Sequence, residues 1–202
     1  PAANASDDVD PTTVTVYAEN YNDLTHETQG NPDYVKDGNP GTIWHTAWSD
    51  TQRDTHYLLF TFGEATEIDG MRFLQRSGGV NGVVTKFDLF VRENESAEWT
   101  QIIDDGVLAT DASWQKIEFD AVNAKQVKFQ VVEAKSDSTS KYAAAAEIRF
   151  TKPQLWISVG EQTERVDKIE IKSNDESIVQ LNGVTANEIA KIDVENDNVA
   201  TV

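Results

Sequence analysis

Apolar residues along this chain recur with a period of two, which is the spacing of β-strands. Phe87, Leu89 and Val91 show it, and similar spacing extends from Val14 to Phe150. Successive side chains of a strand point to opposite faces, whereas a helix needs apolar residues three or four positions apart. No stretch of about 12 residues carries a convincing helical stripe. The chain is therefore predicted to be all-β.

The predicted strands are short and are separated by turn residues such as Gly63, Asn81-Gly82 and Asp111. This spacing is typical of a β-sandwich. The segment 57–62 is interpreted as a strand buried on both faces, because apolar residues occupy nearly all of its positions. Up to residue 150, the predicted strand segments are 14–16, 57–62, 71–73, 87–91, 102, 117–119, 127–131 and 148–150.

The 202 residues are predicted to form one large domain and one small one. Residues 1–13 are polar and are expected to be a linker, with structure beginning at about Val14. Lys152-Pro153 is the predicted boundary of the large domain, 14–152, because proline interrupts the hydrogen bonding of a sheet. Residues 153–202 are expected to be a small β-rich spacer or part of an immunoglobulin-like module, to which 198–202 bear a weak resemblance.

The charge of the chain restricts its partners. It has 17 Lys plus Arg against 35 Asp plus Glu, for a formal net charge of −18. Such a chain repels phosphate backbones and anionic lipids, which argues against nucleic acid and membrane surfaces. No apolar run is long enough to insert into a bilayer. With no cysteine, the chain has neither disulfides nor a thiolate nucleophile.

The segment from Tyr34 to Thr42 combines two glycines, a proline, an asparagine and an aspartate. This composition favours a tight turn rich in oxygen atoms, which is what a hard cation such as Ca²⁺ requires. Asp37 supplies a carboxylate and Thr42 a hydroxyl. A second carboxylate is expected from Glu147, which is flanked by apolar residues where an unpaired acid would be costly.

A candidate ligand surface follows directly after this turn. Trp44 is expected in the core, whereas His45 and Trp48 lie on a predicted loop, and Arg76 and Asn81 flank a glycine-rich segment. Imidazole, guanidinium and amide groups suit the recognition of hydroxyls, and an aromatic ring supplies a flat apolar face. Tyr142, on a polar loop, is a further aromatic candidate. The combination predicts a sugar-binding site.

Residues 14–150 resemble the discoidin-like domain of coagulation factor V/VIII C-terminal type, and within it carbohydrate-binding module family 32. The resemblance rests on Asp37 to Trp48, on Arg76 with Asn81, and on Ala145-Ala146-Glu147-Ile148. It implies a discoidin-like β-sandwich of jelly-roll type with a structural Ca²⁺. The implied metal ligands are Tyr34, Asp37, Asn39, Thr42, Ala146 and Glu147, and the implied sugar-binding residues are His45, Trp48, Arg76, Asn81 and Tyr142.

The resemblance also implies a function. Family 32 modules are non-catalytic, accompany secreted bacterial glycosidases, and often bind terminal galactose or N-acetylgalactosamine. We therefore expect a monomeric module of a larger secreted or cell-surface bacterial enzyme, which it targets to its glycan substrate. The chain is expected to be an internal piece of that longer protein, although a cytosolic protein is the other interpretation of a sequence without a signal segment.

Two alternatives have different sequence requirements. A glycosidase needs two carboxylates about 5 to 10 Å apart across a cleft, and the best candidate acids here are assigned to the cation turn. A discoidin-type adhesion domain binding protein or phospholipid is the other alternative. Membrane-binding relatives display apolar spikes and basic residues, whereas this chain is acidic.

Overall fold

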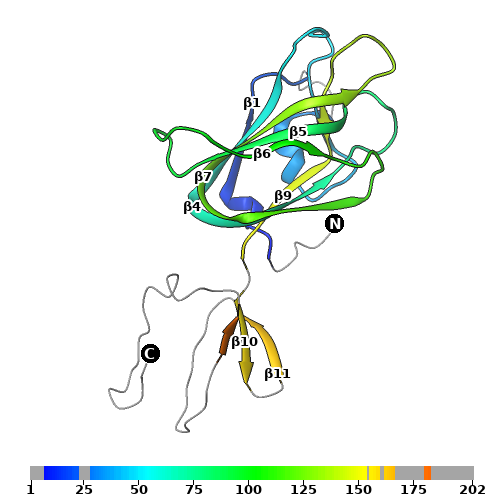
Figure 1. Ribbon diagram of the computed structural model, residues 1–202. Helices are drawn as coiled ribbons and strands as arrows, with labels where there is room; N and C mark the ends of the chain where they lie inside the picture. Colours follow the sequence, from blue (N-terminus) through cyan, green and yellow to red (C-terminus); the bar gives the residue numbers. More distant parts are fainter. Residues whose placement is uncertain (1–6, 23–27, 154, 160–161, 167–179, 183–202) are drawn as a thin grey trace, which may run out of the picture. The chain divides into compact units, whose positions relative to one another are not determined.

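The computed structural model describes residues 7–22, 28–153, 155–159, 162–166 and 180–182 (Figure 1). The chain divides into two compact units, Pro1–Lys152 and Pro153–Val202. In the described part of the first unit, the only helical elements are the 3₁₀ turns η1 (Pro11–Thr13) and η2 (Pro32–Lys36). The prediction of an all-β fold is confirmed.

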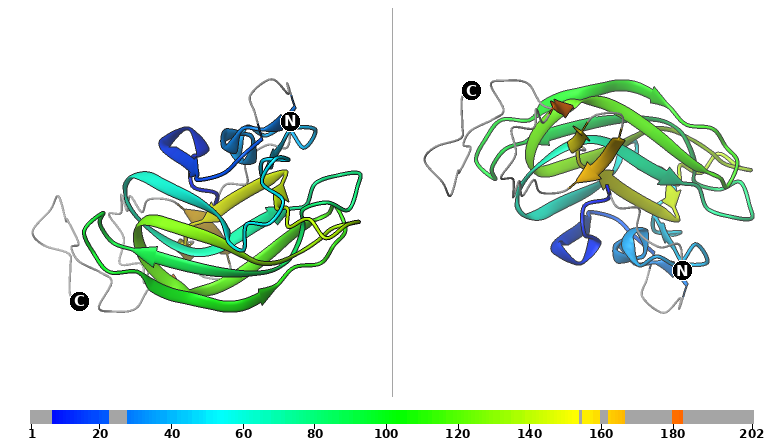
Figure 2. Two further views of the ribbon diagram at one scale, coloured as in Figure 1. Left: turned by 90° about the horizontal axis from the view of Figure 1, so that it is seen from above. Right: turned by 90° about the horizontal axis from the view of Figure 1, so that it is seen from below.

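The first unit is a nine-stranded sheet that curls into a sandwich around one apolar core (Figure 2). Its path runs β1-β4-β7-β5-β8-β3-β2, with β6 paired to β5 and β9 paired to β4. The strands are β1 (Val14–Ala18), β2 (Gln29–Gly30), β3 (Ile43–His45), β4 (His56–Leu74), β5 (Val83–Arg92), β6 (Thr100–Val107), β7 (Trp114–Lys135), β8 (Ala144–Ala145) and β9 (Glu147–Thr151).

Aromatic side chains from separate strands fill the core. Phe129 of β7 stacks between Phe73 of β4 and Phe87 of β5, with ring centroids 5.5 and 5.1 Å apart. Trp44 of β3 is fully buried, which confirms the prediction that it belongs to the core. Burial of such large rings dominates the stability of a small sandwich.

Strands β4 and β7 form a long antiparallel pair that extends through the unit. Segments 57–62 and 71–73, predicted to be separate strands, are both parts of β4. Their register with β7 shifts between Thr61 and Thr66 and again between Ile68 and Gly70. Such irregularities bend a strand without ending it, so Gly63 lies within β4 and not in a turn between two strands.

The prediction that 57–62 is buried on both faces is wrong for one face. Leu58, Phe60 and Phe62 are buried, whereas the residues between them are partly exposed. The first set faces the core and the second forms part of the outer surface of the sheet. Apolar composition alone does not distinguish this arrangement from complete burial.

Residues 7–13, predicted to be a linker, pack against the domain. Arg72 of β4 binds the carboxylates of Asp7 and Asp8 at 2.6 and 2.7 Å. Val9 is buried, and its N–H donates to the carbonyl of Phe150. The polar composition of this segment does not reveal that it packs against the domain, because Arg72, the partner of Asp8, lies 64 positions away in the sequence.

The two ends of the described part of the first unit, at Asp7 and Lys152, lie side by side. Asp8 forms an antiparallel bridge with Thr151 of β9. The Lys152 N–H donates to the carbonyl of Asp7 at 2.8 Å. The chain therefore enters and leaves this unit at one place.

The described part of the second unit is a three-stranded antiparallel sheet. Its central strand, β10 (Leu155–Val159), pairs with β11 (Gln162–Val166) on one side and β12 (Gln180–Asn182) on the other. The predicted immunoglobulin-like resemblance of 198–202 lies outside the described residues. Among the residues that are described in either unit, no helix has the length and apolarity needed to cross a bilayer.

Candidate functional site

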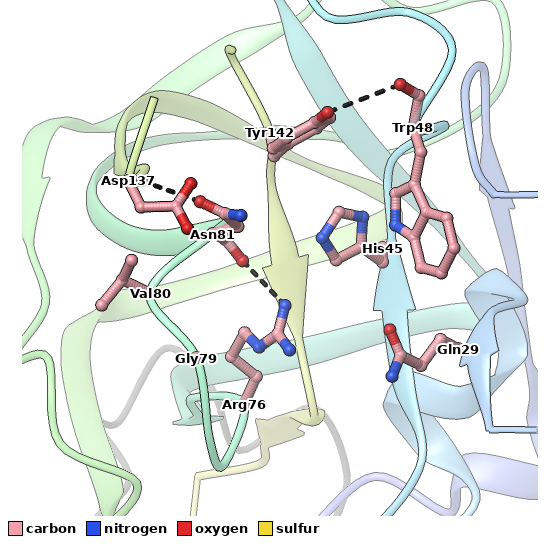
Figure 3. A pocket seen from close by; sticks show the side chains of 9 residues that line it. All are labelled: Gln29, His45, Trp48, Arg76, Gly79, Val80, Asn81, Asp137 and Tyr142. Atoms are coloured by element: carbon pink, nitrogen blue, oxygen red, sulfur yellow. Dashed lines mark hydrogen bonds between the residues drawn. The ribbon is translucent and has the colours of Figure 1, made fainter. Parts of the chain in front are cut away.

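A pocket of about 410 Å³ lies where the loops preceding β5 and β8 meet the end of β3 (Figure 3). It is large enough for a small organic ligand. Aromatic, amide and charged side chains share its wall. The lining residues are Gln29, His45, Trp48, Arg76, Gly79, Val80, Asn81, Asp137 and Tyr142.

The structure brings all the side chains predicted for a sugar site into this one pocket. His45 ends β3, Trp48 follows it, Arg76 follows β4, Asn81 precedes β5 and Tyr142 precedes β8. These residues are spread over nearly 100 positions of the sequence, and only the sheet order places them together.

The short strand β8 joins the two sides of the pocket. Ala144 pairs with His45 of β3 and with Val83 of β5. Gly82, at a φ of +84°, lets the loop before β5 approach β8 closely. A Cβ atom at this position would lie 2.9 Å from the backbone of Ala143 and Ala144, so only glycine fits there.

His45 is the most deeply buried polar group of the pocket, with 2 % of its surface exposed. Its Nδ1 lies 2.7 Å from the carbonyl of Thr46. A carbonyl only accepts, so Nδ1 carries the proton and Nε2 is left as an acceptor. Burial lowers the pKa of His45, the bond to Thr46 opposes this shift, and the positive charge of Arg76 adds to it. The imidazole is therefore neutral at physiological pH.

Two aromatic rings contact this imidazole. Its centroid lies 6.1 Å from that of Trp48, edge to face, and 5.4 Å from that of Tyr142. The Tyr142 hydroxyl donates to the Trp48 carbonyl at 3.4 Å, and the Trp48 side chain is 43 % exposed. The pocket thus combines a buried hydrogen-bonding group with aromatic walls (Figure 3).

Arg76 and Asn81 are held by backbone and side-chain contacts that leave part of each side chain for a ligand. Arg76 donates through Nε to the Gly78 carbonyl at 3.0 Å and through Nη1 to the Asn81 carbonyl at 2.8 Å. Burial lowers the pKa of Arg76, yet a guanidinium stays charged. The Asn81 Oδ1 accepts from Ser136 and from the Asp137 N–H, so its Nδ2 is the donor available to a ligand.

Gln29, Gly79, Val80 and Asp137 line the pocket but were not among the predicted site residues. Gln29 belongs to the two-residue strand β2, and the sequence around it has no recognisable motif. Gly79 and Val80 lie in the segment already singled out by Arg76 and Asn81. Nothing in the sequence next to Asp137 indicates that it lines the pocket, because its partner Asn81 lies 56 positions away.

A second buried histidine supports the wall that carries Tyr142. His56 of β4 donates through Nε2 to the carbonyl of Lys141 at 2.9 Å, and its Nδ1 is buried without a partner. Burial lowers the pKa of His56, although the bond to Lys141 opposes the shift. This loop is therefore stabilised by a neutral imidazole.

The fold should lose stability in acid through these two histidines. Their pKa values are lowered on folding, so the unfolded chain binds more protons below about pH 6.5. Their contribution is complete above that pH and falls as the pH decreases toward the lowered values. The histidine contribution to the free energy of unfolding in urea should therefore decline between about pH 7.5 and 5.5, whereas Glu147, whose pKa is raised to about 7, contributes with the opposite sign.

His56→Gln, which keeps a donor for the Lys141 carbonyl, is the matched variant. Its decline over the same pH interval should be smaller than that of the wild type. Subtracting the free energy of unfolding of His56→Gln from that of the wild type at each pH removes the contribution of the carboxyl groups, which titrate alike in both proteins. Identical slopes would contradict a role for His56 in this decline.

The predicted cation turn is a closed network of hydrogen bonds. Asp37 accepts through Oδ1 from the Asn39 N–H at 2.8 Å and through Oδ2 from the Thr42 hydroxyl at 2.7 Å. The Thr42 hydroxyl also lies 2.8 Å from the Asn39 carbonyl. Gly38, at a φ of +77°, allows the chain to reverse between these residues. The turn thus gathers carboxylate, hydroxyl and carbonyl oxygens.

Glu147 of β9 faces this turn and is 1 % exposed. Its Oε2 accepts from Arg149 Nη2 at 2.8 Å, whereas its Oε1 is buried without a partner. Burial raises the pKa of Glu147 to about 7; Arg149 opposes the shift and the charge of Asp37 adds to it. A cation at Oε1 would remove the cost of this buried oxygen.

The predicted ligand residues offer the kinds of oxygen that Ca²⁺ accepts. No group of three or more His, Cys, Asp or Glu that could hold a metal occurs among the described residues. Two carboxylates would therefore need oxygens of other kinds, which Ca²⁺ accepts readily. Tyr34 lies in η2, Asn39 and Thr42 in the turn, and the fully buried Ala146 directly precedes Glu147.

The fold of the first unit is similar to that of known carbohydrate-binding modules. A family 32 module of Clostridium perfringens NanJ, solved in complex with galactose, is 19 % identical, with a TM-score of 0.60 over 71 % of this chain and 97 % of its own. CpGH89CBM32-5 of the same organism, in complex with GalNAc-β-1,3-galactose, is 24 % identical, with a TM-score of 0.64 over 71 % and 99 %.

Among curated proteins, a sialidase of Micromonospora viridifaciens is 29 % identical over 126 residues. The match covers 61 % of this chain and 19 % of the sialidase, so the chain spans about a fifth of that relative's length. Residues 14–148 match the F5/8 type C domain family. Since this match covers more than half of the chain, the protein belongs to the F5/8 type C domain family.

Proposed function

We propose that this chain is a non-catalytic carbohydrate-binding module that recognises terminal galactose or N-acetylgalactosamine. The observation that carries the proposal is the pocket, where a neutral His45 acceptor, the Arg76 guanidinium and the Asn81 amide lie beside aromatic rings. The ligands of the similar Clostridium modules, galactose and GalNAc-β-1,3-galactose, support the same class of sugar.

The arrangement suits an axial hydroxyl. In galactose the axial 4-hydroxyl leaves one face of the ring as a continuous patch of C–H groups, which would lie on Trp48 or Tyr142. His45 and Arg76 would then bind the 3- and 4-hydroxyls. An equatorial 4-hydroxyl, as in glucose, would leave buried polar groups unpaired at a cost of about 1 to 3 kcal/mol each.

A binding role without catalysis is consistent with the acids of the site. Glycoside hydrolysis needs a pair of carboxylates flanking the scissile bond. Of the described residues that line the pocket, Asp137 alone has a carboxylate. Asp37 of the turn and Glu147 of β9 lie outside this lining, and we assign them to a structural Ca²⁺ with Thr42 and the carbonyls of Tyr34, Asn39 and Ala146.

The module is proposed to target a larger bacterial enzyme, secreted or at the cell surface, to its glycan substrate. The sialidase relative is several times longer than the matched region, which is the arrangement expected of an accessory domain. A single shallow site binds weakly, with an expected Kd on the order of 0.1 to 1 mM. Neighbouring modules in the same polypeptide would raise retention through avidity.

Calorimetric titration with galactose, N-acetylgalactosamine and glucose tests the proposal. The first two should bind with millimolar or sub-millimolar Kd, and glucose should bind at least about tenfold more weakly because its 4-hydroxyl leaves polar groups unpaired. Trp48→Ala should weaken galactose binding by removing an aromatic wall.

Trp114→Ala is the matched control, because Trp114 has nearly the same exposure, 42 % against 43 %, and does not line the pocket. It should leave binding unchanged. Equal affinity for glucose and galactose, or equal losses in the two tryptophan variants, would count against a galactose site here.

A further inference from the structure

We propose that Asp137 makes the pocket discriminate among galactose-type sugars by their charge, favouring a sugar that carries an ammonium group and disfavouring one that carries a carboxylate. This inference rests on the proposed function of the pocket. It concerns a residue that lines the wall but belongs to neither the predicted sugar site nor the cation turn.

The position of Asp137 is fixed by its own backbone. Its N–H donates to Asn81 Oδ1 at 2.8 Å, and the preceding Ser136 hydroxyl donates to the same oxygen at 3.0 Å. Figure 3 shows its side chain beside Asn81, on the side of the pocket away from Trp48 and Gln29. The carboxylate is thereby held next to an amide that we assign to ligand binding.

Asp137 and Arg76 are the two charged side chains of the pocket lining, and the described part of the structure shows no ion pair between them. None of the ion pairs formed by described residues includes Asp137. His45 is neutral because burial lowers its pKa. Arg76 directs its Nε and Nη1 to the carbonyls of Gly78 and Asn81 and pairs with no described carboxylate. A ligand therefore meets a carboxylate that a positive substituent can neutralise.

The expected size of the effect follows from exposure. Asp137 is exposed to solvent, and exposed ion pairs change an equilibrium constant by up to about fivefold. The effect should therefore be about three- to fivefold for each unit of ligand charge at low salt. It should shrink at about 0.15 M salt, because screening acts strongly on exposed charges.

The test compares the binding of three sugars. Galactosamine, galactose and galacturonic acid share the axial 4-hydroxyl and differ in charge. Their Kd values would be measured by NMR titration at low salt, at a pH where the amine is protonated. The wild type should bind galactosamine about three- to fivefold more tightly than galactose, and galacturonic acid correspondingly more weakly.

Asp137→Asn should bring the galactosamine to galactose ratio close to one and improve galacturonic acid binding relative to galactose. Glu133→Gln, an equal change in net charge at an exposed residue of β7 that does not line the pocket, is the control and should keep the wild-type ratios.

If galactose binds but Asp137→Asn leaves both ratios unchanged, the inference is wrong and the proposed function stands. If none of the three sugars binds the wild type, the proposed function itself fails. Equal shifts in the Asp137 and Glu133 variants would assign the effect to net charge and overturn the role of Asp137.

Discussion

His45→Ala is expected to weaken galactose binding by roughly 10- to 100-fold, which would raise an expected Kd of about 0.1 to 1 mM to about 1 to 100 mM. The variant removes a neutral acceptor that is 2 % exposed and oriented through Nδ1 by the Thr46 carbonyl. A ligand hydroxyl that enters the pocket would then lose its partner inside a site already shielded from water, and such unmet groups are costly. NMR titration detects the loss directly.

The imidazole also packs against Trp48 and Tyr142, so the alanine variant removes packing as well as an acceptor. His45→Gln separates the two effects, because its amide still offers an acceptor oxygen. It should retain more affinity than the alanine variant. Both variants should remain folded and unfold in a cooperative thermal transition. Undiminished galactose binding by a folded His45→Ala variant would exclude the pocket as the sugar site.

Removal of calcium is expected to lower the Tm of the domain by about 5 to 10 °C when the ion is otherwise present at about 100 times its Kd. The physical reason is Glu147, whose Oε1 is buried without a partner while Oε2 is paired with Arg149. An ion there would satisfy that oxygen and fasten β9 to the turn around Asp37. Differential scanning fluorimetry in calcium and in EGTA measures the shift.

Glu147→Gln should lose most of the calcium-induced shift, whatever its absolute stability. Asp37→Asn is a second variant should the first not fold, because it also removes one of the two carboxylates. Magnesium should stabilise less than calcium, since it demands a more regular set of ligands. An identical Tm in calcium and in EGTA would refute the calcium site.

Sequence reasoning was most successful where a local pattern has a single physical meaning. Alternation such as that of Phe87, Leu89 and Val91 predicts a strand with one buried face, and these residues are buried in β5. Grouping His45 and Trp48 with Arg76, however, relied on the chemistry of their side chains and on a family resemblance. Nothing in the spacing of these residues specifies the pairing of β3, β8 and β5 that brings them together.

The missed roles of Asp137, Asp7 and Asp8 depend on contacts between distant positions. Asp137 reaches the pocket through Asn81, and Asp7 and Asp8 are fixed by Arg72. A polar residue in a sequence looks the same whether it faces solvent or a partner many positions away. For the same reason, the register shifts that keep β4 continuous past Thr61 could not be read from its turn-like glycine.

The bridge between Asp8 and Thr151 holds the two ends of the described part of the first unit next to each other. A longer polypeptide could accept such a unit within an existing loop without its own ends being pulled apart. Such a unit could therefore be moved or duplicated during evolution. The loops that line its pocket could change while the bridge between its two ends is kept.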